Sequence, residues 1–117
     1  MPEVEVWYNP RCSKCRTASG ILADRGVDAT VLEYLKEPPT VEELRSVMTM
    51  IGTGDPRAIA RRGEAVWREL GLDDATDDEV LAAMAANPIL IERPIVVVDG
   101  RAVVARPPER LLELLGD

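Results

Sequence analysis

The sequence contains no histidine and only two cysteines, which argues against a structural zinc site. Zinc in such sites takes about four ligands, most of them cysteine or histidine side chains. Phenylalanine is absent as well, and aromatic residues make up only 3% of the chain. No platform is therefore available for stacking the bases of single-stranded nucleic acid. We expect no bound metal and no direct binding of nucleic acid.

Charge and hydropathy argue against two further classes of protein. The formal net charge is -7, so the chain would repel phosphate backbones, and general affinity for DNA or RNA is not expected. The longest apolar stretch is interrupted at Asn87-Pro88, well short of a membrane span, and no charged-then-apolar leader is recognisable. We expect residues 1–117 to form a single domain that is monomeric, cytoplasmic and free of membranes.

Both cysteines lie in one short stretch, residues 9–16, and are three residues apart. Upstream, residues 3–8 alternate valine with glutamate before two aromatic residues, which predicts a β-strand. Downstream, apolar residues recur at helical spacing until Gly26, which is expected to end the helix. The pattern therefore places Cys12 on a strand-to-helix turn.

A thiol in the first turn of a helix is a candidate nucleophile. Unpaired backbone N–H groups and the positive end of the helix dipole favour the thiolate, so the pKa of Cys12 should be lowered. Arg11, Lys14 and Arg16 add positive charge that we expect to lower it further. Cys15 follows one helical turn later on the same face, where its sulfur could resolve a mixed disulfide on Cys12. The alternative is two incidental core cysteines.

The middle of the chain is predicted to be helical. A β-branched run predicts a second strand at residues 30–34, parallel to the first. Two Thr-x-x-Glu capping boxes then begin amphipathic helices. Two shorter helices are expected between them, and the first carries Arg61 and ends before Gly63. The capping boxes are Thr40 with Glu43 and Thr76 with Glu79, within a helical insert of about residues 40–87.

The end of the chain changes character. Two apolar runs at residues 95–98 and 102–105 flank Asp99-Gly100, a dipeptide typical of a tight type I′ hairpin. A leucine-rich helix is expected after Pro107-Pro108. The resulting order of elements predicts an α/β (α+β) protein of the thioredoxin-like plan. It has a mixed four-stranded sheet with flanking helices and the helical insert between its second and third strands.

At this level of detail the sequence resembles the glutaredoxin-linked arsenate reductase family. The resemblance spans essentially the whole chain, and its motifs are specific as an ordered set although a C-x-x-C alone is common. The residues that carry it are Asn9-Pro10-Arg11-Cys12-Ser13-Lys14, Tyr34-Leu35 before Pro38-Pro39, Arg57 to Arg62, Pro88 to Ile91 with Arg93-Pro94, and Arg106-Pro107.

The resemblance implies an enzyme that reduces arsenate to arsenite. Cys12 would attack the arsenic atom to form a thiol-arsenic adduct, while Arg61, Arg93 and Arg106 would hold the oxyanion. Guanidinium groups suit this role because their paired donors match phosphate-like oxygens and stay charged. Electrons would come from glutathione and a glutaredoxin-type partner, without a bound cofactor. With Cys15 as a resolving thiol, a thioredoxin-type reductant could serve instead.

Three residues are assigned supporting roles by the same resemblance. Asn9 and Arg16 belong to the turn of the nucleophile, and Pro94 occupies the position of the cis-proline that thioredoxin-like folds place opposite the active cysteine. We therefore expect a cis Arg93-Pro94 bond. Tyr8 stands where some members of the family carry a histidine, so no imidazolium assists Cys12.

Two other functions share this pattern. Spx-type transcription regulators carry the same C-x-x-C as a redox switch and bind RNA polymerase. A general thiol-disulfide oxidoreductase would use the same turn without any arsenic chemistry. Retention of Arg106 favours the arsenate reductase, whereas Cys15 slightly favours the redox switch.

Overall fold

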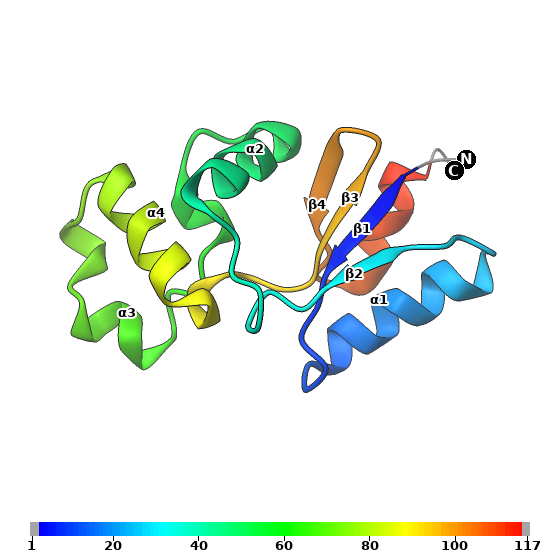
Figure 1. The fold of residues 1–117 in the computed structure, drawn as a ribbon, viewed down its shortest axis with the longest axis horizontal. Coiled ribbons are helices and arrows are strands. Elements are labelled where there is room, and N and C mark those ends of the chain that lie inside the picture. Colours follow the sequence, from blue (N-terminus) through cyan, green and yellow to red (C-terminus); the bar gives the residue numbers. More distant parts are fainter. Residues whose placement is uncertain (1–2, 116–117) are drawn as a thin grey trace.

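A computed structural model describes residues 3–115, and its centre is a mixed four-stranded sheet (Figure 1). The strands are β1 (Val4–Trp7), β2 (Thr30–Leu32), β3 (Ile95–Val98) and β4 (Arg101–Val104). They lie in the order β2-β1-β3-β4. β1 pairs parallel with β2 and antiparallel with β3, which pairs antiparallel with β4. The predicted parallel unit and the predicted C-terminal hairpin are both confirmed.

The second strand is shorter than predicted. It ends at Leu32 instead of Tyr34, because Leu32 is the register partner of Trp7, where β1 also ends. The chain then turns, with the Lys36 amide donating to the Glu33 carbonyl at 2.9 Å. The side chain of Tyr34 is fully buried in this turn. A residue predicted to lie in a strand thus enters the core from a loop.

The two faces of the sheet are covered by different helices. Val6 packs under α1 (Ser13–Asp24) and the C-terminal 3-10 helix η4 (Pro108–Leu114). Its neighbour Trp7 points the other way, into a second apolar cluster with α2 (Val41–Ile51). Figure 1 shows α1 and η4 on one side of the sheet and α2 on the other. The helix predicted after Pro107-Pro108 is therefore present, with 3-10 geometry.

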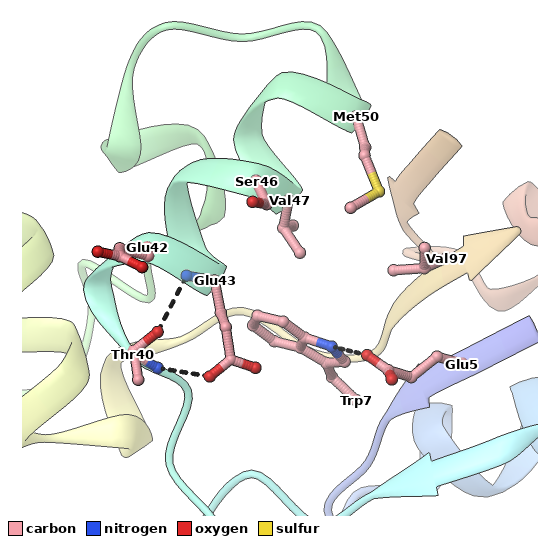
Figure 2. A pocket seen from close by; sticks show the side chains of 9 residues that line it. All are labelled: Glu5, Trp7, Thr40, Glu42, Glu43, Ser46, Val47, Met50 and Val97. Carbon is pink, nitrogen blue, oxygen red and sulfur yellow. Dashed lines mark hydrogen bonds between the residues drawn. The ribbon is translucent and has the colours of Figure 1, made fainter. Parts of the chain in front are cut away.

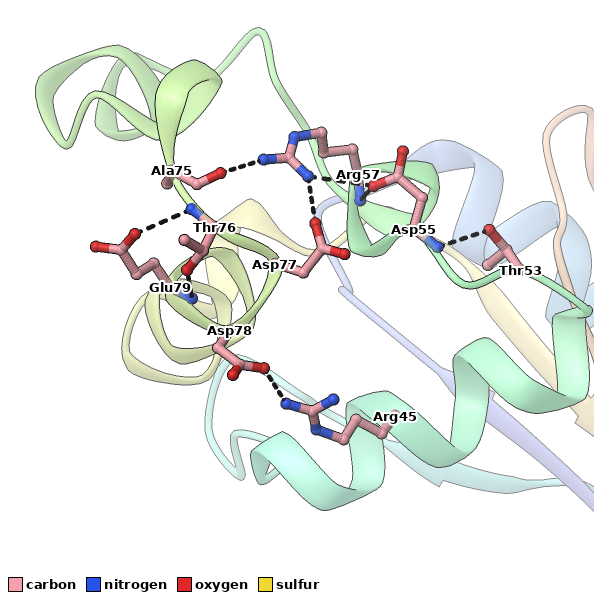
Figure 3. Close-up of polar contacts among 9 residues, drawn as sticks. All are labelled: Arg45, Thr53, Asp55, Arg57, Ala75, Thr76, Asp77, Asp78 and Glu79. Carbon is pink, nitrogen blue, oxygen red and sulfur yellow. Dashed lines mark hydrogen bonds and ion pairs between the residues drawn. The ribbon is translucent and has the colours of Figure 1, made fainter.

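The helical insert contains the two predicted capping boxes, and both are confirmed. Thr40 caps α2 and Thr76 caps α4 (Asp77–Ala86), each with reciprocal hydrogen bonds to a glutamate. Arg57 ties the insert together, because its Nη1 contacts Asp77 at 2.8 Å and its Nη2 donates to the Ala75 carbonyl at 2.6 Å (Figure 3). The remaining short elements are η1 (Pro56–Ile59), α3 (Ala65–Glu69), η2 (Leu72–Asp74) and η3 (Pro88–Leu90).

The prediction that Arg61 lies on a short helix is wrong. The helix η1 ends at Ile59, and Ala60 forms an antiparallel bridge with Ile91. The Arg61 amide donates to the Leu90 carbonyl at 2.7 Å, and the Glu92 amide donates to the Ile59 carbonyl at 2.8 Å. Helices of the 3-10 type rarely exceed about four residues, and these long-range pairs take the backbone groups that a longer helix would need.

Two further predictions concern the hairpin turn and membrane-spanning helices. Asp99 and Gly100 have φ angles of 47° and 82°, the pair of positive values that a type I′ turn requires, as predicted. Every helix within residues 3–115 is too short or too polar to cross a lipid bilayer.

Candidate active site

The turn between β1 and α1 presents Cys12 at the N-cap of the helix, as predicted. The Cys12 amide donates to the Asn9 carbonyl at 2.9 Å, and the Asn9 side-chain oxygen accepts from the Arg11 amide at 2.9 Å. Arg16 reaches back so that its Nη1 donates to the Pro10 carbonyl at 2.8 Å. Asn9 and Arg16 therefore brace the backbone of the turn.

The two thiols differ strongly in acidity. Burial opposes ionisation of Cys12, but the Cys15 backbone N–H, the Cys15 thiol and the neighbouring Arg93 guanidinium together hold its pKa below the ordinary 9.0. Burial raises the pKa of Cys15 to about 12, and the adjacent Cys12 acts in the same direction. Both cysteines are free and buried, with 8% exposure for Cys12 and none for Cys15. Of the two thiols, Cys12 is therefore the one favoured as a thiolate, whereas Cys15 stays protonated at neutral pH and can donate a hydrogen bond to it.

The positive charge that acts on Cys12 comes from a distant part of the sequence. Arg93 is the cation with the largest effect on the pKa of this thiol, and the predicted contributors Arg11, Lys14 and Arg16 are not among the leading causes. The reason is geometric for Arg16, whose guanidinium is turned toward the Pro10 carbonyl. An exposed cation near a thiol in sequence therefore matters less than a partly buried one packed against it.

Arg93 lies at the end of the segment that leads into β3, and its peptide bond to Pro94 is cis, as predicted. The Arg106-Pro107 bond is cis as well, which the sequence did not predict. The Arg93 Nε atom is buried and has no hydrogen-bond partner within residues 3–115. A buried donor of this kind is normally paired, so it is available to an acceptor that enters the site.

Tyr34 is a neighbour of this group that sequence reasoning missed as a site residue. Its hydroxyl is buried without a hydrogen-bond partner among the described residues. Burial raises the pKa of Tyr34 to about 12, opposed by the charge of Arg93 and reinforced by Cys15. Tyr34 therefore stays protonated and neutral at neutral pH, within electrostatic reach of Arg93 and Cys15. In the sequence, Tyr34 stood out only as part of the motifs that carry the family resemblance. A single tyrosine in a predicted strand does not by itself indicate a site residue.

The other two predicted arginines meet in an adjoining pocket of about 280 Å³. Arg61 and Arg106 approach the same carboxylate oxygen, Glu92 Oε1, each at 3.7 Å. Arg61 Nη1 also contacts Glu64 at 2.6 Å. The pocket is lined by Arg61, Arg62, Gly63, Glu64, Glu92 and Arg106. Arg106 Nη1 donates to the Arg93 carbonyl at 3.0 Å, which links this pocket to the thiol side.

The three arginines are thus split between two adjoining places. Arg93 acts directly on Cys12, whereas Arg61 and Arg106 surround Glu92. Sequence reasoning missed both carboxylates of the pocket, Glu64 and Glu92. A signal existed for Glu92, because it stands next to Arg93 between two apolar runs, where a second charge is as unexpected as the first.

A different hollow, of about 300 Å³, lies between α2 and the sheet (Figure 2). Its hydrogen bonds belong to the capping box of α2 and to the Trp7 indole, which donates to Glu5 at 2.9 Å. It is lined by neither a thiol nor a guanidinium. We therefore place no chemistry in it and assign the site to the Cys12 turn and the arginine pocket.

A comparison with models of known protein families identifies the family of this chain. Residues 7–114 match the model of the ArsC family, a range that includes both cysteines, Glu92 and the arginines. This chain belongs to the ArsC family. The family resemblance deduced from the sequence is thereby confirmed.

Curated relatives match this chain over most of their length. An arsenate reductase of Neisseria meningitidis is 41% identical over 98% of this chain and 100% of that protein. An arsenate reductase of Escherichia coli is 36% identical over 100% of this chain and 84% of that protein. The solved structure of an arsenate reductase from Vibrio cholerae superposes with a TM-score of 0.93 at 43% identity, covering 96% of this chain and 97% of that one. The predicted thioredoxin-like fold is therefore confirmed.

Proposed function

We propose that this ArsC-family protein is a thiol-dependent arsenate reductase in which Cys12 is the nucleophile. The observation that carries the proposal is the division of acidity between the thiols. Cys12 has a lowered pKa beside Arg93, while the pKa of Cys15 is raised to about 12. One sulfur is therefore prepared to attack and the other to donate a hydrogen bond. The arsenate reductases of Neisseria meningitidis and Escherichia coli among its relatives support the choice of substrate.

The proposed reaction balances with two thiols for each arsenate. The Cys12 sulfur forms a bond to arsenic(V), and one arsenate oxygen takes up protons and leaves as water. An external thiol then reduces the adduct, so that its sulfur and that of Cys12 together give two electrons to arsenic. Arsenite leaves, and Cys12 is left in a disulfide that a second reductant cleaves. The electrons come from thiols such as glutathione, so the reaction needs no resident cofactor.

The arginines would bind and polarise the oxyanion. Arg93 would contact an oxygen of the group under attack; its interaction with Cys12 and its unpaired buried Nε support this role. Arg61 and Arg106 would hold the remaining oxygens from the adjoining pocket. Guanidinium donors fixed before the reaction stabilise charge that develops on oxygen in the transition state. Asn9 and Arg16 serve by holding the turn, and Pro94 by positioning the backbone after Arg93.

The electron donor follows from Cys15. A buried thiol with a pKa of about 12 is a poor attacking group, so an external thiol of the glutathione and glutaredoxin type is the first choice. A thioredoxin-type donor would require Cys15 to become deprotonated after Cys12 has reacted. Both donors are cytoplasmic, and we propose that the protein works there as a monomer.

Steady-state arsenate reduction tests this function. Turnover would be followed with glutathione plus glutaredoxin and, separately, with thioredoxin, each coupled to NADPH oxidation, with Cys12→Ser as the inactive control. We expect arsenate-dependent turnover with the glutaredoxin system. Reduction of glutathione mixed disulfides without any arsenate reduction would favour a general oxidoreductase. Redox-dependent binding to RNA polymerase without turnover would favour the regulator.

A further inference from the structure

A carboxylate stands in the middle of the arginine pocket, and the proposed function leaves its role unexplained. Glu92 Oε1 lies 3.7 Å from Arg61 Nε and 3.7 Å from Arg106 Nη1. A pocket built only to attract an anion would gain nothing from a negative charge between its two guanidinium groups. The presence of Glu92 at this point therefore calls for a function of its own.

The carboxylate does not fill the pocket. Both distances of 3.7 Å exceed the usual hydrogen-bond range of about 2.7 to 3.2 Å, so neither guanidinium is saturated by Glu92. Within residues 3–115, the Nη2 atoms of Arg61 and Arg106 donate no hydrogen bond, and the ion pairs of these residues are made through Nε and Nη1. Glu64 differs, since its oxygen contacts Arg61 Nη1 at 2.6 Å. Guanidinium donors thus remain free beside a carboxylate oxygen, Glu92 Oε1, that accepts only one long hydrogen bond, from the Arg93 amide.

The backbone fixes Glu92 in this place. Its amide donates to the Ile59 carbonyl at 2.8 Å, and the bridge between Ala60 and Ile91 holds the two segments in register. Arg61 follows Ala60 directly, so it faces Glu92 across this bridge. The Arg93 amide also donates a long hydrogen bond of 3.4 Å to Glu92 Oε1. About three quarters of the Glu92 side chain is shielded, since its exposure is 25%.

We propose that Glu92 is a specificity-determining residue that accepts a hydrogen bond from a protonated oxygen of a tetrahedral oxyanion. The anion would be bound by Arg61 and Arg106, so that the pocket takes hydrogen arsenate or hydrogen phosphate and rejects sulfate. This inference rests on the proposed function only in placing the oxyanion in this pocket.

The selectivity follows from the inventory of donors and acceptors. An ionised carboxylate can only accept hydrogen bonds. Arsenate and phosphate keep at least one proton at neutral pH and can therefore donate to Glu92. Sulfate has none, so its oxygen would face the carboxylate as a second unpaired acceptor with the same charge. A site that hydrogen-bonds a polar group of its ligand can bind an analogue lacking that group far more weakly. The reason is that the analogue leaves the hydrogen-bonding group of the site unpaired.

Binding of unreactive anions tests the proposal without any turnover. Isothermal titration calorimetry at pH 7 and constant ionic strength would compare inorganic phosphate with sulfate. We expect the wild-type protein to bind phosphate at least about tenfold more tightly than sulfate. In Glu92→Gln the ratio should fall toward one, mainly because sulfate binds more tightly to an amide that can donate.

Glu64→Gln is the matched control, because it removes the same charge from the other side of Arg61. That variant should bind both anions more tightly while keeping their ratio. Equal affinity of the wild type for the two anions, no binding of either, or an unchanged ratio in Glu92→Gln would overturn the proposal.

A second comparison covers the case in which Glu92→Gln does not fold. Wild-type protein should then prefer phosphate over selenate, a larger anion that is likewise fully ionised, by a similar factor. If the affinities of the wild type for phosphate, sulfate and selenate instead followed the size of the anion alone, the result would count against the role of Glu92. Selective phosphate binding in a protein that cannot reduce arsenate would leave this inference intact and refute the proposed function. Arsenate reduction by a protein that binds phosphate and sulfate equally well would support the proposed function and refute this inference.

Discussion

Arg106 donates a hydrogen bond from its Nη1 atom to the carbonyl oxygen of Arg93 at 3.0 Å. Arg93 comes shortly before β3 and Arg106 shortly after β4, and these strands are antiparallel neighbours. The hairpin therefore brings together two arginines that are 13 positions apart in the sequence. Through this contact the charge beside Cys12 and the pocket around Glu92 form one continuous site, and the predictions below separate its two parts.

Replacement of Cys12 by serine should remove arsenate reduction. A hydroxyl has no accessible anionic form at neutral pH, so we expect turnover to fall by more than about a thousandfold. The coupled NADPH assay measures the loss, and circular dichroism verifies that the variant is folded. Substantial residual turnover would take Cys12 out of the mechanism.

Replacement of Cys15 should distinguish a resolving role from a hydrogen-bonding role. In Cys15→Ser a hydroxyl can still donate to Cys12, so turnover with glutathione and glutaredoxin should persist. Any turnover that the wild type shows with thioredoxin should be lost, because no second sulfur remains to form the internal disulfide. In Cys15→Ala the pKa of Cys12 should rise, measured from the pH dependence of its alkylation by iodoacetamide. Equal loss with both donors in Cys15→Ser would indicate a structural role.

Arg93 should affect both the acidity of the thiol and the reaction. Arg93→Lys retains the charge, so the pKa of Cys12 should change little, while the loss of the planar fork should lower turnover about a hundredfold. Arg93→Ala should also raise the pKa of Cys12. Alkylation kinetics and the turnover assay give the two readouts. An unchanged Cys12 pKa in Arg93→Ala would contradict the assignment of Arg93 as the cation beside the thiol.

Arg61 and Arg106 should act on turnover without acting strongly on the thiol. They meet around Glu92, and neither is a leading cause of the lowered pKa of Cys12. We expect Arg61→Lys and Arg106→Lys to lower kcat/KM for arsenate by about tenfold or more, with iodoacetamide alkylation of Cys12 nearly unchanged. Wild-type rates in all three lysine variants, including Arg93→Lys, would refute the arginine pocket and favour the redox switch.

Tyr34→Phe tests the cost of a buried hydroxyl. The Tyr34 oxygen has no hydrogen-bond partner among the described residues, so its removal should leave the free energy of unfolding at pH 7 unchanged or raise it by about 1 kcal/mol. Urea denaturation measures this value. A clear loss of stability would show that the hydroxyl makes a favourable interaction in solution.

The same variant should change the response to alkaline pH. Burial raises the pKa of Tyr34 from 10.0 to about 12, so the unfolded chain loses this proton first as the pH rises. Its contribution to stability is therefore complete below pH 10 and is lost as the pH approaches 12. Between pH 9 and 11, Tyr34→Phe should lose less stability than the wild type. An equal loss would mean that Tyr34 titrates normally in the folded protein.

Local sequence was sufficient for most elements of secondary structure. The capping boxes at Thr40 and Thr76 and the turn at Asp99-Gly100 involve groups within a few residues of one another. Such signals act before any tertiary contact is made, and for this reason the predicted helix starts and the hairpin are confirmed. The position of Cys12 at a helix N-cap follows from the same kind of local evidence.

Only the tertiary structure decided which charges meet. Arg61 lies outside the predicted helix because its amide pairs with the Leu90 carbonyl. The cation that acts most on the pKa of Cys12 is Arg93, not the predicted cations of the turn. Glu92 and Tyr34 became part of the site through contacts with segments far away in the sequence. Electrostatic and hydrogen-bond energies depend on distance in space and on burial, and neither quantity is encoded in the spacing of residues along the chain.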